Sequence, residues 1–311
     1  MSRNAGKKSE VSNFDPTEWV RSVASFNREP VRKLAKLPVE TKPHPKPKHR
    51  REGASVVVIP DAHAKPGTNQ SRFDALGNAL VEWAPDYLVS IGDLSDVPSL
   101  STHGDIEGES YAEDIAVTVD ALARITEPAK RFNKRKPESR RLPFTRRGRQ
   151  HITLGNHEWR VVRTIESDPA RFGGGVISLD DFRFEDFGFI RHDYGSVLNI
   201  EGLSLSHIFP SGVMGRPIGG ATAALSLIRT NLVSSIAGHS HLLDYSEKVR
   251  ASDGRRIQGM TCGCFFDYPM TWTTPQVNAQ YRSGILRVRD LVDGEFDYEW
   301  VSQRRLEREF L

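Results

Sequence analysis

The sequence has little cysteine, no long apolar run and little net charge, and each shortage excludes a class of protein. Its 311 residues contain two cysteines, Cys262 and Cys264, which are separated by one glycine. Cysteines this close seldom form an unstrained disulfide, and a chain of this length does not need a disulfide framework. We therefore expect reduced thiols and a cytoplasmic protein. A metal site built on these two cysteines would lack the second pair that such sites use.

The lack of long apolar runs argues against a membrane protein. No stretch approaches the roughly 18 consecutive apolar residues that a membrane-spanning helix needs. Residues 1–15 contain no apolar segment of the kind found in secretory signals. Hydrophobic residues make up 38% of the chain and charged residues 27%, which is ordinary for a globular protein, and the length suits one large domain or two small ones.

The net charge of +3 is small, but the basic residues are concentrated in two segments. Residues 130–149 hold ten lysines or arginines against one glutamate, and residues 42–51 add five more together with three prolines. Such segments can bind phosphates. They are also common in solvated loops and disordered tails, and the sequence leaves both interpretations open.

Composition divides the chain into three parts. Residues 1–53 form an appendage, with a short helix predicted over 15–26 and an extended proline-containing linker over 42–51. Residues 54–302 form the main domain, and residues 303–311 are expected to be a C-terminal tail. The appendage can bind a partner or remain disordered, and the chain contains no internal repeat.

From residue 54 onward, β-branched apolar runs alternate with helical periodicity. This alternation predicts strands over 55–60, 87–91 and 151–154 and helices over 71–84, 111–132 and 158–167. After Phe187 strands predominate, with one helix expected near 221–231 behind a glycine-rich loop. The order indicates an α/β fold with a layered core.

Five predicted strands end in side chains that can bind a metal. The strand-end clusters are Asp61-Ala62-His63, Gly92-Asp93, Gly155-Asn156-His157-Glu158, His207 and Gly238-His239-Ser240-His241. Ligands of open α/β sheets bind beyond the carboxyl ends of the strands. We therefore expect clusters far apart in sequence to meet at one site.

Carboxylate, imidazole and amide groups together suit manganese, iron, zinc or magnesium. Two such cations about 3.5–4 Å apart can hold a phosphate oxygen and acidify water. Asp61 and His63 are two residues apart, as are His239 and His241, so in an extended segment each pair lies on one side. Any one of these motifs is common in turns and hydrogen-bonded histidines. Their combination, each after an apolar strand, favours a metal site.

In this order, the five motifs resemble those of the calcineurin-like metallophosphoesterase superfamily, over roughly residues 55–300. The resemblance implies a four-layer α/β/β/α sandwich with a dinuclear metal site at the strand ends. It assigns one cation to Asp61, His63, Asp93 and His241, and the other to Asp93, Asn156, His207 and His239, with Asp93 bridging. It also implies that His157 stabilises the transition state or protonates the leaving oxygen, which makes His157 and Asp93 the catalytic candidates.

Two details qualify the resemblance. Glu158 can orient His157 or cap the helix that follows, and we favour a structural role. The phosphoprotein phosphatase branch has an arginine soon after its Gly-Asp motif, whereas the stretch from Gly92 to Ser99 has none. The motifs look more like those of bacteriophage and bacterial phosphoesterases. For a phage-encoded protein, the location would be the host cytoplasm.

The resemblance implies a two-metal phosphoester hydrolase in which water activated at the cations attacks phosphorus. Manganese is the expected cation, and iron, zinc, nickel and magnesium are alternatives. The basic segment 130–149 follows the second motif and precedes the third, so we expect it beside the active site, where it would guide nucleic acid. Arg160 and His103 are candidates for contact with the substrate phosphate.

The expected substrate is therefore a nucleic acid or nucleotide, and the expected activity is that of a phosphodiesterase or nuclease. A phosphomonoesterase acting on nucleotides or other small phosphoesters is the alternative, because the same ligands serve both reactions. A third possibility is a non-catalytic scaffold that binds nucleic acid. No membrane partner is expected, and the sequence leaves the oligomeric state and native metals open.

Overall fold

The structure is a computed structural model that describes residues 53–102, 110–271 and 273–311. All of these residues belong to one compact unit, Glu52–Leu311. The predicted helix over 15–26, the predicted linker over 42–51 and the candidate His103 lie outside the described residues.

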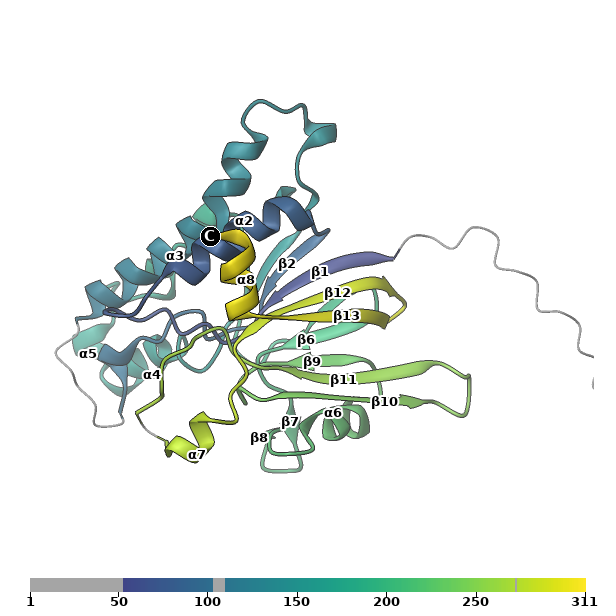
Figure 1. Ribbon diagram of the computed structural model, residues 1–311. Coiled ribbons are helices and arrows are strands. Elements are labelled where there is room, and N and C mark those ends of the chain that lie inside the picture. Colours follow the sequence, from purple (N-terminus) through teal and green to yellow (C-terminus); the bar gives the residue numbers. More distant parts are fainter. Residues whose placement is uncertain (1–52, 103–109, 272) are drawn as a thin grey trace, which may run out of the picture. The chain divides into compact units, whose positions relative to one another are not determined.

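The larger sheet has six strands and carries the first three strand-end clusters (Figure 1). In spatial order its strands are β13 (Glu295–Ser302), β12 (Gly284–Val292), β1 (Ala54–Ile59), β2 (Tyr87–Ser90), β3 (Gln150–Thr153) and β4 (Ile190–His192). Strands β1 to β4 run parallel to one another, while β12 and β13 are antiparallel to their neighbours. The carboxyl ends of β1, β2 and β3 therefore lie along one edge.

The second sheet has five strands and carries the remaining clusters. In spatial order they are β10 (Leu243–Val249), β11 (Arg256–Cys262), β9 (Ser235–Ala237), β6 (Leu203–Ser206) and β5 (Leu198–Ile200). Strands β6 and β9 are parallel neighbours, so the histidines that follow them also share an edge. The predicted α/β class is confirmed: the described chain contains two main sheets and helices that pack on them.

The apolar run of β1 is buried on both faces, which explains why it shows no alternation with polar residues. Val56 and Val58 pack in the cluster between the two sheets, together with residues of β6 and β9. Val57 and Ile59 point the other way, into the cluster beneath the helices. Burying each such side chain contributes about 1.5–3 kcal/mol, so this strand holds two layers of the molecule together.

Three helices pack on the outer face of the six-stranded sheet: α2 (Ser71–Trp83), α3 (Tyr111–Asn133) and α8 (Gln303–Phe310). Helix α3 begins at a capping box, in which Ser110 and Glu113 satisfy each other's backbone N–H groups. The segment predicted to be a tail forms helix α8, where Leu306 is buried and Phe310 packs on Trp83. No described helix is both long and apolar enough to cross a membrane.

Helix α6 (Ala223–Asn231) packs on the outer face of the five-stranded sheet. A Cβ at Gly259 of β11 would overlap the carbonyl of Ala224, so glycine is needed for this close approach. The remaining elements are short: β7 (Pro210–Ser211), β8 (Arg216–Pro217), α4 (Arg160–Ser167), α5 (Pro169–Phe172), α7 (Pro275–Asn278), and the 3-10 turns η1 (Pro98–Leu100), η2 (Glu138–Arg140), η3 (Pro143–Thr145), η4 (Leu179–Phe182) and η5 (Phe184–Phe187).

The basic segment 130–149 lies at the wrong end of the sheet to guide a substrate to the strand-end clusters. Phe144 donates its N–H to the carbonyl of Pro85, and the carbonyl of Arg149 accepts from Leu88, at the start of β2. The clusters follow the opposite ends of these strands. The expectation that this segment lies beside the active site is therefore wrong, because α3 carries the chain back along the full sheet before β3 begins (Figure 1).

Candidate metal centre

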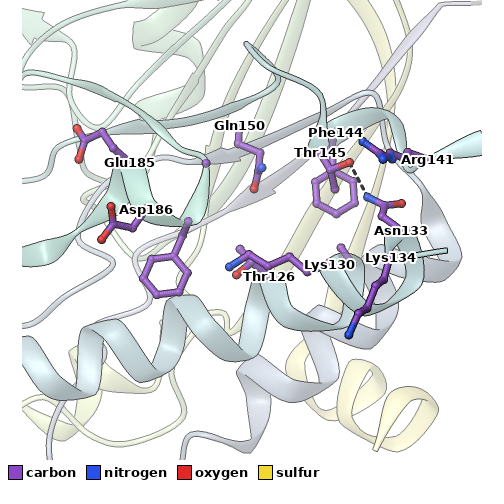
Figure 2. A pocket seen from close by; sticks show the side chains of 13 residues that line it. Thr126, Lys130, Asn133, Lys134, Arg141, Phe144, Thr145, Gln150, Glu185 and Asp186 are labelled. Atoms are coloured by element: carbon purple, nitrogen blue, oxygen red, sulfur yellow. Dashed lines mark hydrogen bonds between the residues drawn. The ribbon is translucent and has the colours of Figure 1, made fainter. Parts of the chain in front are cut away.

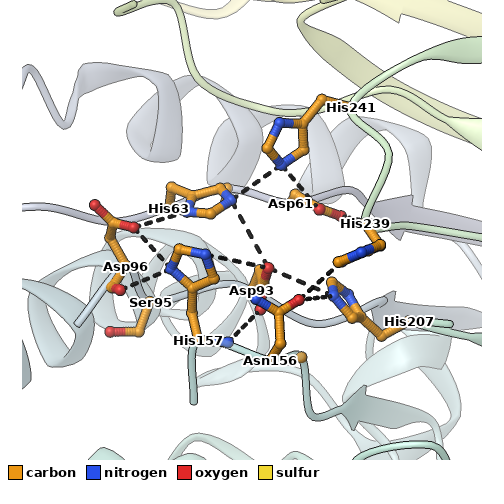
Figure 3. Close-up of polar contacts among 12 residues, drawn as sticks. Asp61, His63, Asp93, Ser95, Asp96, Asn156, His157, His207, His239 and His241 are labelled. Atoms are coloured by element: carbon orange, nitrogen blue, oxygen red, sulfur yellow. Dashed lines mark hydrogen bonds and ion pairs between the residues drawn. The ribbon is translucent and has the colours of Figure 1, made fainter. Parts of the chain in front are cut away.

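The strand ends of both sheets meet at one cluster of acidic, amide and imidazole side chains (Figure 3). The six-stranded sheet supplies Asp61 and His63 after β1, Asp93 after β2, and Asn156 and His157 after β3. The five-stranded sheet supplies His207 after β6, and His239 and His241 after β9. The structure therefore brings together every predicted metal ligand, from segments up to 180 positions apart.

One group of ligand atoms is formed by Asp61, His63 and His241, whose donor atoms lie within 4.8 Å of one another. The Nε2 atoms of His63 and His241 face each other at 3.2 Å. The side chain of Asp61 is fully buried, and its Oδ2 lies 3.2 Å from His241 Nε2 without a regular hydrogen bond to any residue that the structure describes. Buried lone pairs converging in this way suit a cation.

A second group is formed by Asp93, His207 and His239, again with donor atoms within 4.8 Å. The Oδ1 atom of Asn156 adds an amide oxygen to this group, 3.0 Å from His207 Nε2 and 2.8 Å from His239 Nδ1. This donor set of carboxylate, imidazole and amide oxygen fits a borderline divalent cation.

Asp93 lies between the two groups. Its Oδ2 atom is 3.4 Å from His207 Nε2 in the second group and 3.9 Å from His63 Nε2 in the first. Burial raises the pKa of Asp93, but the imidazoles of His207, His157 and His63 more than offset it and hold that pKa well below its usual range. A carboxylate that stays ionised in this position can be shared by two cations.

The histidines are held in the state that metal binding requires. His63 donates from Nδ1 to Asp96 Oδ1 at 3.0 Å, and His207 donates from Nδ1 to the carbonyl of Ile91 at 3.1 Å, so both Nε2 lone pairs point into the cluster. Burial, reinforced by the nearby His157, lowers the pKa of His63 to about 4. A neutral imidazole is the form that binds a metal.

Four of these residues have backbone conformations that non-glycine residues rarely adopt. The φ angles are 44° at His63, 48° at Asp93, 67° at His239 and 57° at His241. Each costs about 1–3 kcal/mol and persists only where the surroundings enforce it, which is typical of functional sites. The expectation that alternation along extended segments aligns Asp61 with His63, and His239 with His241, is wrong: left-handed turns aim these side chains.

Glycines leave room for the two buried carboxylates. A Cβ at Gly155 would overlap Asp93 Oδ1, and one at Gly238 would lie 2.6 Å from Asp61 Oδ1. Both glycines belong to the strand-end motifs, so their role there is to let the backbone approach an acidic side chain closely.

Asp96 is a site residue that the sequence analysis does not single out. Its Oδ1 atom accepts a hydrogen bond from Nδ1 of His63 at 3.0 Å. Nδ1 of His157 donates to the backbone carbonyl of Asp96 at 2.8 Å and also lies 2.8 Å from the same Oδ1 atom, as an ion pair. Asp96 thus fixes two imidazoles at once, with both Nε2 atoms facing Asp93. The available signal in the sequence is a second carboxylate three residues after Asp93.

Glu158 has a structural role, but neither of the two that the sequence suggests. Its fully buried carboxylate accepts hydrogen bonds from the backbone N–H groups of Asp93 at 3.0 Å, Ser95 at 2.9 Å and Gly155 at 2.9 Å. It caps no helix, since α4 begins at Arg160 without a side-chain cap, and it is Asp96 that hydrogen-bonds the His157 ring. Instead it fastens together the loops that follow β2 and β3.

Arg160 reaches the edge of the cluster from α4. Its Nη1 atom donates to the carbonyls of Asp96 at 2.7 Å and Val97 at 3.1 Å, and its Nη2 atom lies 3.3 Å from His157 Nε2. The guanidinium is therefore anchored beside the catalytic candidate.

Comparison with known proteins adds little to this geometry. No protein-family model matches the chain, and no curated protein does. Among solved structures the chain is similar to that of Yfce, a phosphoesterase from E. coli, with a TM-score of 0.35 and 13% identity over 80% of this chain and 100% of that one.

Proposed function

We propose that this protein is a two-metal-dependent phosphoester hydrolase with the four-layer metallophosphoesterase fold. The observation that carries the proposal is the convergence of two ligand groups, from two sheets, on the shared carboxylate of Asp93. The layering of helices, six-stranded sheet, five-stranded sheet and α6 supports the fold assignment.

One cation would be held by Asp61, His63, Asp93 and His241, and the other by Asp93, Asn156, His207 and His239. When bound, the two cations supply charge neutralisation of the phosphoryl oxygens and acidification of water, and manganese suits the ligand set. The buried Asp61 Oδ2, 3.2 Å from His241 Nε2, and the facing imidazole nitrogens of His63 and His241 fit this assignment.

His157 is suited to donate a proton to the departing oxygen. Asp96 anchors its Nδ1 atom, so Nε2 is the nitrogen that faces the cluster. Burial lowers the pKa of His157, but Asp93 and the hydrogen bond to Asp96 outweigh this effect and raise that pKa above its ordinary value. A raised pKa increases the protonated share of this imidazole, which is the form that a general acid needs.

Arg160 is suited to bind a phosphate oxygen next to His157. Two backbone carbonyls hold one of its terminal nitrogens, which leaves Nη2 directed at the Nε2 atom of His157. A guanidinium positioned in this way recognises a phosphate without losing much side-chain freedom on binding.

Aromatic rings on both sides of the cluster favour a phosphodiester of a nucleic acid or nucleotide. The Tyr281 ring lies 4.8 Å from that of His241, and the Tyr194 ring lies 6.3 Å from that of His207 and stacks on Trp159. Bases on either side of a scissile phosphate can stack on such rings, at about 1–3 kcal/mol per base.

Paired substrates test the reaction class. With manganese, we expect faster hydrolysis of bis-p-nitrophenyl phosphate than of p-nitrophenyl phosphate. The opposite preference would identify a phosphomonoesterase, and inactivity on both with metals bound would favour a non-catalytic scaffold. A panel of single-stranded DNA, duplex DNA, RNA and cyclic nucleotides then identifies the substrate.

A further inference from the structure

A cavity of about 420 Å³ lies at the other end of the six-stranded sheet from the metal centre. It is open to solvent and is lined by the last turns of α3, the segment Arg141–Thr145 and the η5 turn (Figure 2). Gln150, the first residue of β3, lines it, whereas the metal-centre residues Asn156 and His157 follow the last residue of that strand. The cavity is therefore distinct from the hydrolytic site.

The side chain of Gln150 lies at the base of the cavity, and its amide oxygen is free to accept a hydrogen bond. The residue is 7% exposed, and its Oε1 atom has no hydrogen-bond partner among the residues that the structure describes. Its amide points into the cavity between Phe144 and the η5 turn (Figure 2). A Cβ at Gly188 would lie 2.8 Å from Gln150 Nε2, so glycine there leaves room for the amide. A buried amide with no partner is costly, and a ligand can supply the missing bonds.

The rim of the cavity carries opposite charges on its two sides. Lys134 and Arg141 are exposed on one side, and no carboxylate of the described chain pairs with either. On the other side the carboxylates of Glu185 and Asp186 are already engaged, with Arg191 at 3.6 Å and Arg183 at 2.7 Å respectively. The positive charges of Lys134 and Arg141 are therefore not neutralised by neighbouring carboxylates, and a phosphate can bind to them.

We propose that this cavity binds one nucleotide unit, with the base edge on Gln150 and the phosphate on Lys134 and Arg141. A glutamine amide matches a base edge that has an adjacent donor and acceptor, as adenine has. The volume is within the range of small-molecule sites. The Phe187 ring, which lies 5.0 Å from Lys130 Nζ, adds an aromatic surface to the wall. The unit can come from a free mononucleotide or from a single strand.

Photolabelling of the full-length, metal-loaded protein with 8-azido-AMP, followed by peptide mapping, tests the proposal. The pocket variants are Gln150→Met, which removes the amide, and the double variant Lys134→Ala/Arg141→Ala. The double variant Arg146→Ala/Arg147→Ala is the matched control, since it removes the same charge from the same segment outside the cavity. Thermal unfolding of each variant verifies that it is folded.

We expect labelled peptides from the α3 end, residues 141–150 or the η5 turn. Labelling should fall at least about tenfold in both pocket variants, since one loses the amide that would bind the base and the other loses two charged partners of the phosphate. The control should keep its labelling, and so should Asp93→Asn, which disables only the proposed hydrolytic site. Both pocket variants should hydrolyse bis-p-nitrophenyl phosphate at the normal rate.

Labelling confined to peptides of the metal centre, or lost equally in the control variant, would overturn the proposal. Inorganic phosphate that competes as well as AMP would reduce the cavity to a simple anion site and would also overturn it. Competition by AMP or by oligodeoxyadenylate supports it, and the tighter competitor identifies a free nucleotide or a strand as the source.

Discussion

Replacing Asp96 with asparagine should separate the anchoring of two histidines from the direct binding of metal. The carboxylate oxygen Oδ1 accepts a hydrogen bond from His63 at 3.0 Å and forms an ion pair with Nδ1 of His157 at 2.8 Å, beside the backbone carbonyl of Asp96 that accepts from the same nitrogen. Hydrogen bonds of this kind to a charged group contribute about 1.5–3 kcal/mol each. Asparagine keeps the shape of the side chain but loses the charge.

The substitution should weaken both proton donation by His157 and metal binding through His63. If about 2–3 kcal/mol of transition-state stabilisation at His157 is lost, kcat falls about 30- to 160-fold. Because the partner of His63 is weakened too, metal affinity should fall about 10- to 100-fold. Hydrolysis of bis-p-nitrophenyl phosphate across a manganese titration measures both effects, since only the second is reversed by excess metal.

The pH profile provides a second readout. Asp96 raises the pKa of His157, so the Asp96→Asn variant should have a lower pKa at that imidazole. A general acid works only while protonated, so the alkaline fall in kcat should begin at lower pH in the variant. The control is Asp86→Asn, which removes a carboxylate that accepts hydrogen bonds from Ser55 at the opposite end of the sheet. If Asp96→Asn matches Asp86→Asn in kcat and pH profile, Asp96 does not orient His157.

Three further substitutions test the rest of the site. His157→Ala should lower turnover at least about a hundredfold while metal content, measured by elemental analysis, stays unchanged; full turnover with metals loaded would remove His157 from the reaction. Asp93→Asn should lower both activity and the number of bound ions per chain, and unaltered stoichiometry would exclude it as a shared ligand. Glu158→Gln should reduce the free energy of unfolding in urea by about 2 kcal/mol, because one backbone N–H then faces an amide NH₂. The control Glu166→Gln changes an exposed glutamate of α4, the helix that follows Glu158, and should have no effect. Equal stability of the two variants would show that Glu158 does not hold the two loops together.

The strands that carry the site are predictable from the sequence because their apolar runs are buried on both faces. The run 55–60 corresponds to β1 at Ala54–Ile59, and 151–154 to β3 at Gln150–Thr153, each within one residue. A helix over 111–132 corresponds to α3 at Tyr111–Asn133. Since parallel strands end at one edge, the strand-end motifs also predict which side chains meet.

The local geometry of the site is not predictable in the same way. The left-handed backbone at His63 and His241 is enforced by tertiary contacts and not by residue preference, so spacing along the chain indicates alternation instead. The roles of Asp96 and Glu158 depend on partners that come from other loops. Residues 130–149 lie between two motifs in the sequence but not beside them in the structure, because α3 carries the chain to the far end of the sheet.

The two-cation site is tested most directly by anomalous X-ray diffraction from crystals grown with manganese. We expect two anomalous peaks about 3.5–4 Å apart, one beside Asp61, His63 and His241, the other beside Asn156, His207 and His239, with the carboxylate of Asp93 between them. A single peak, or two peaks that Asp93 does not bridge, would exclude a two-cation site that shares this carboxylate.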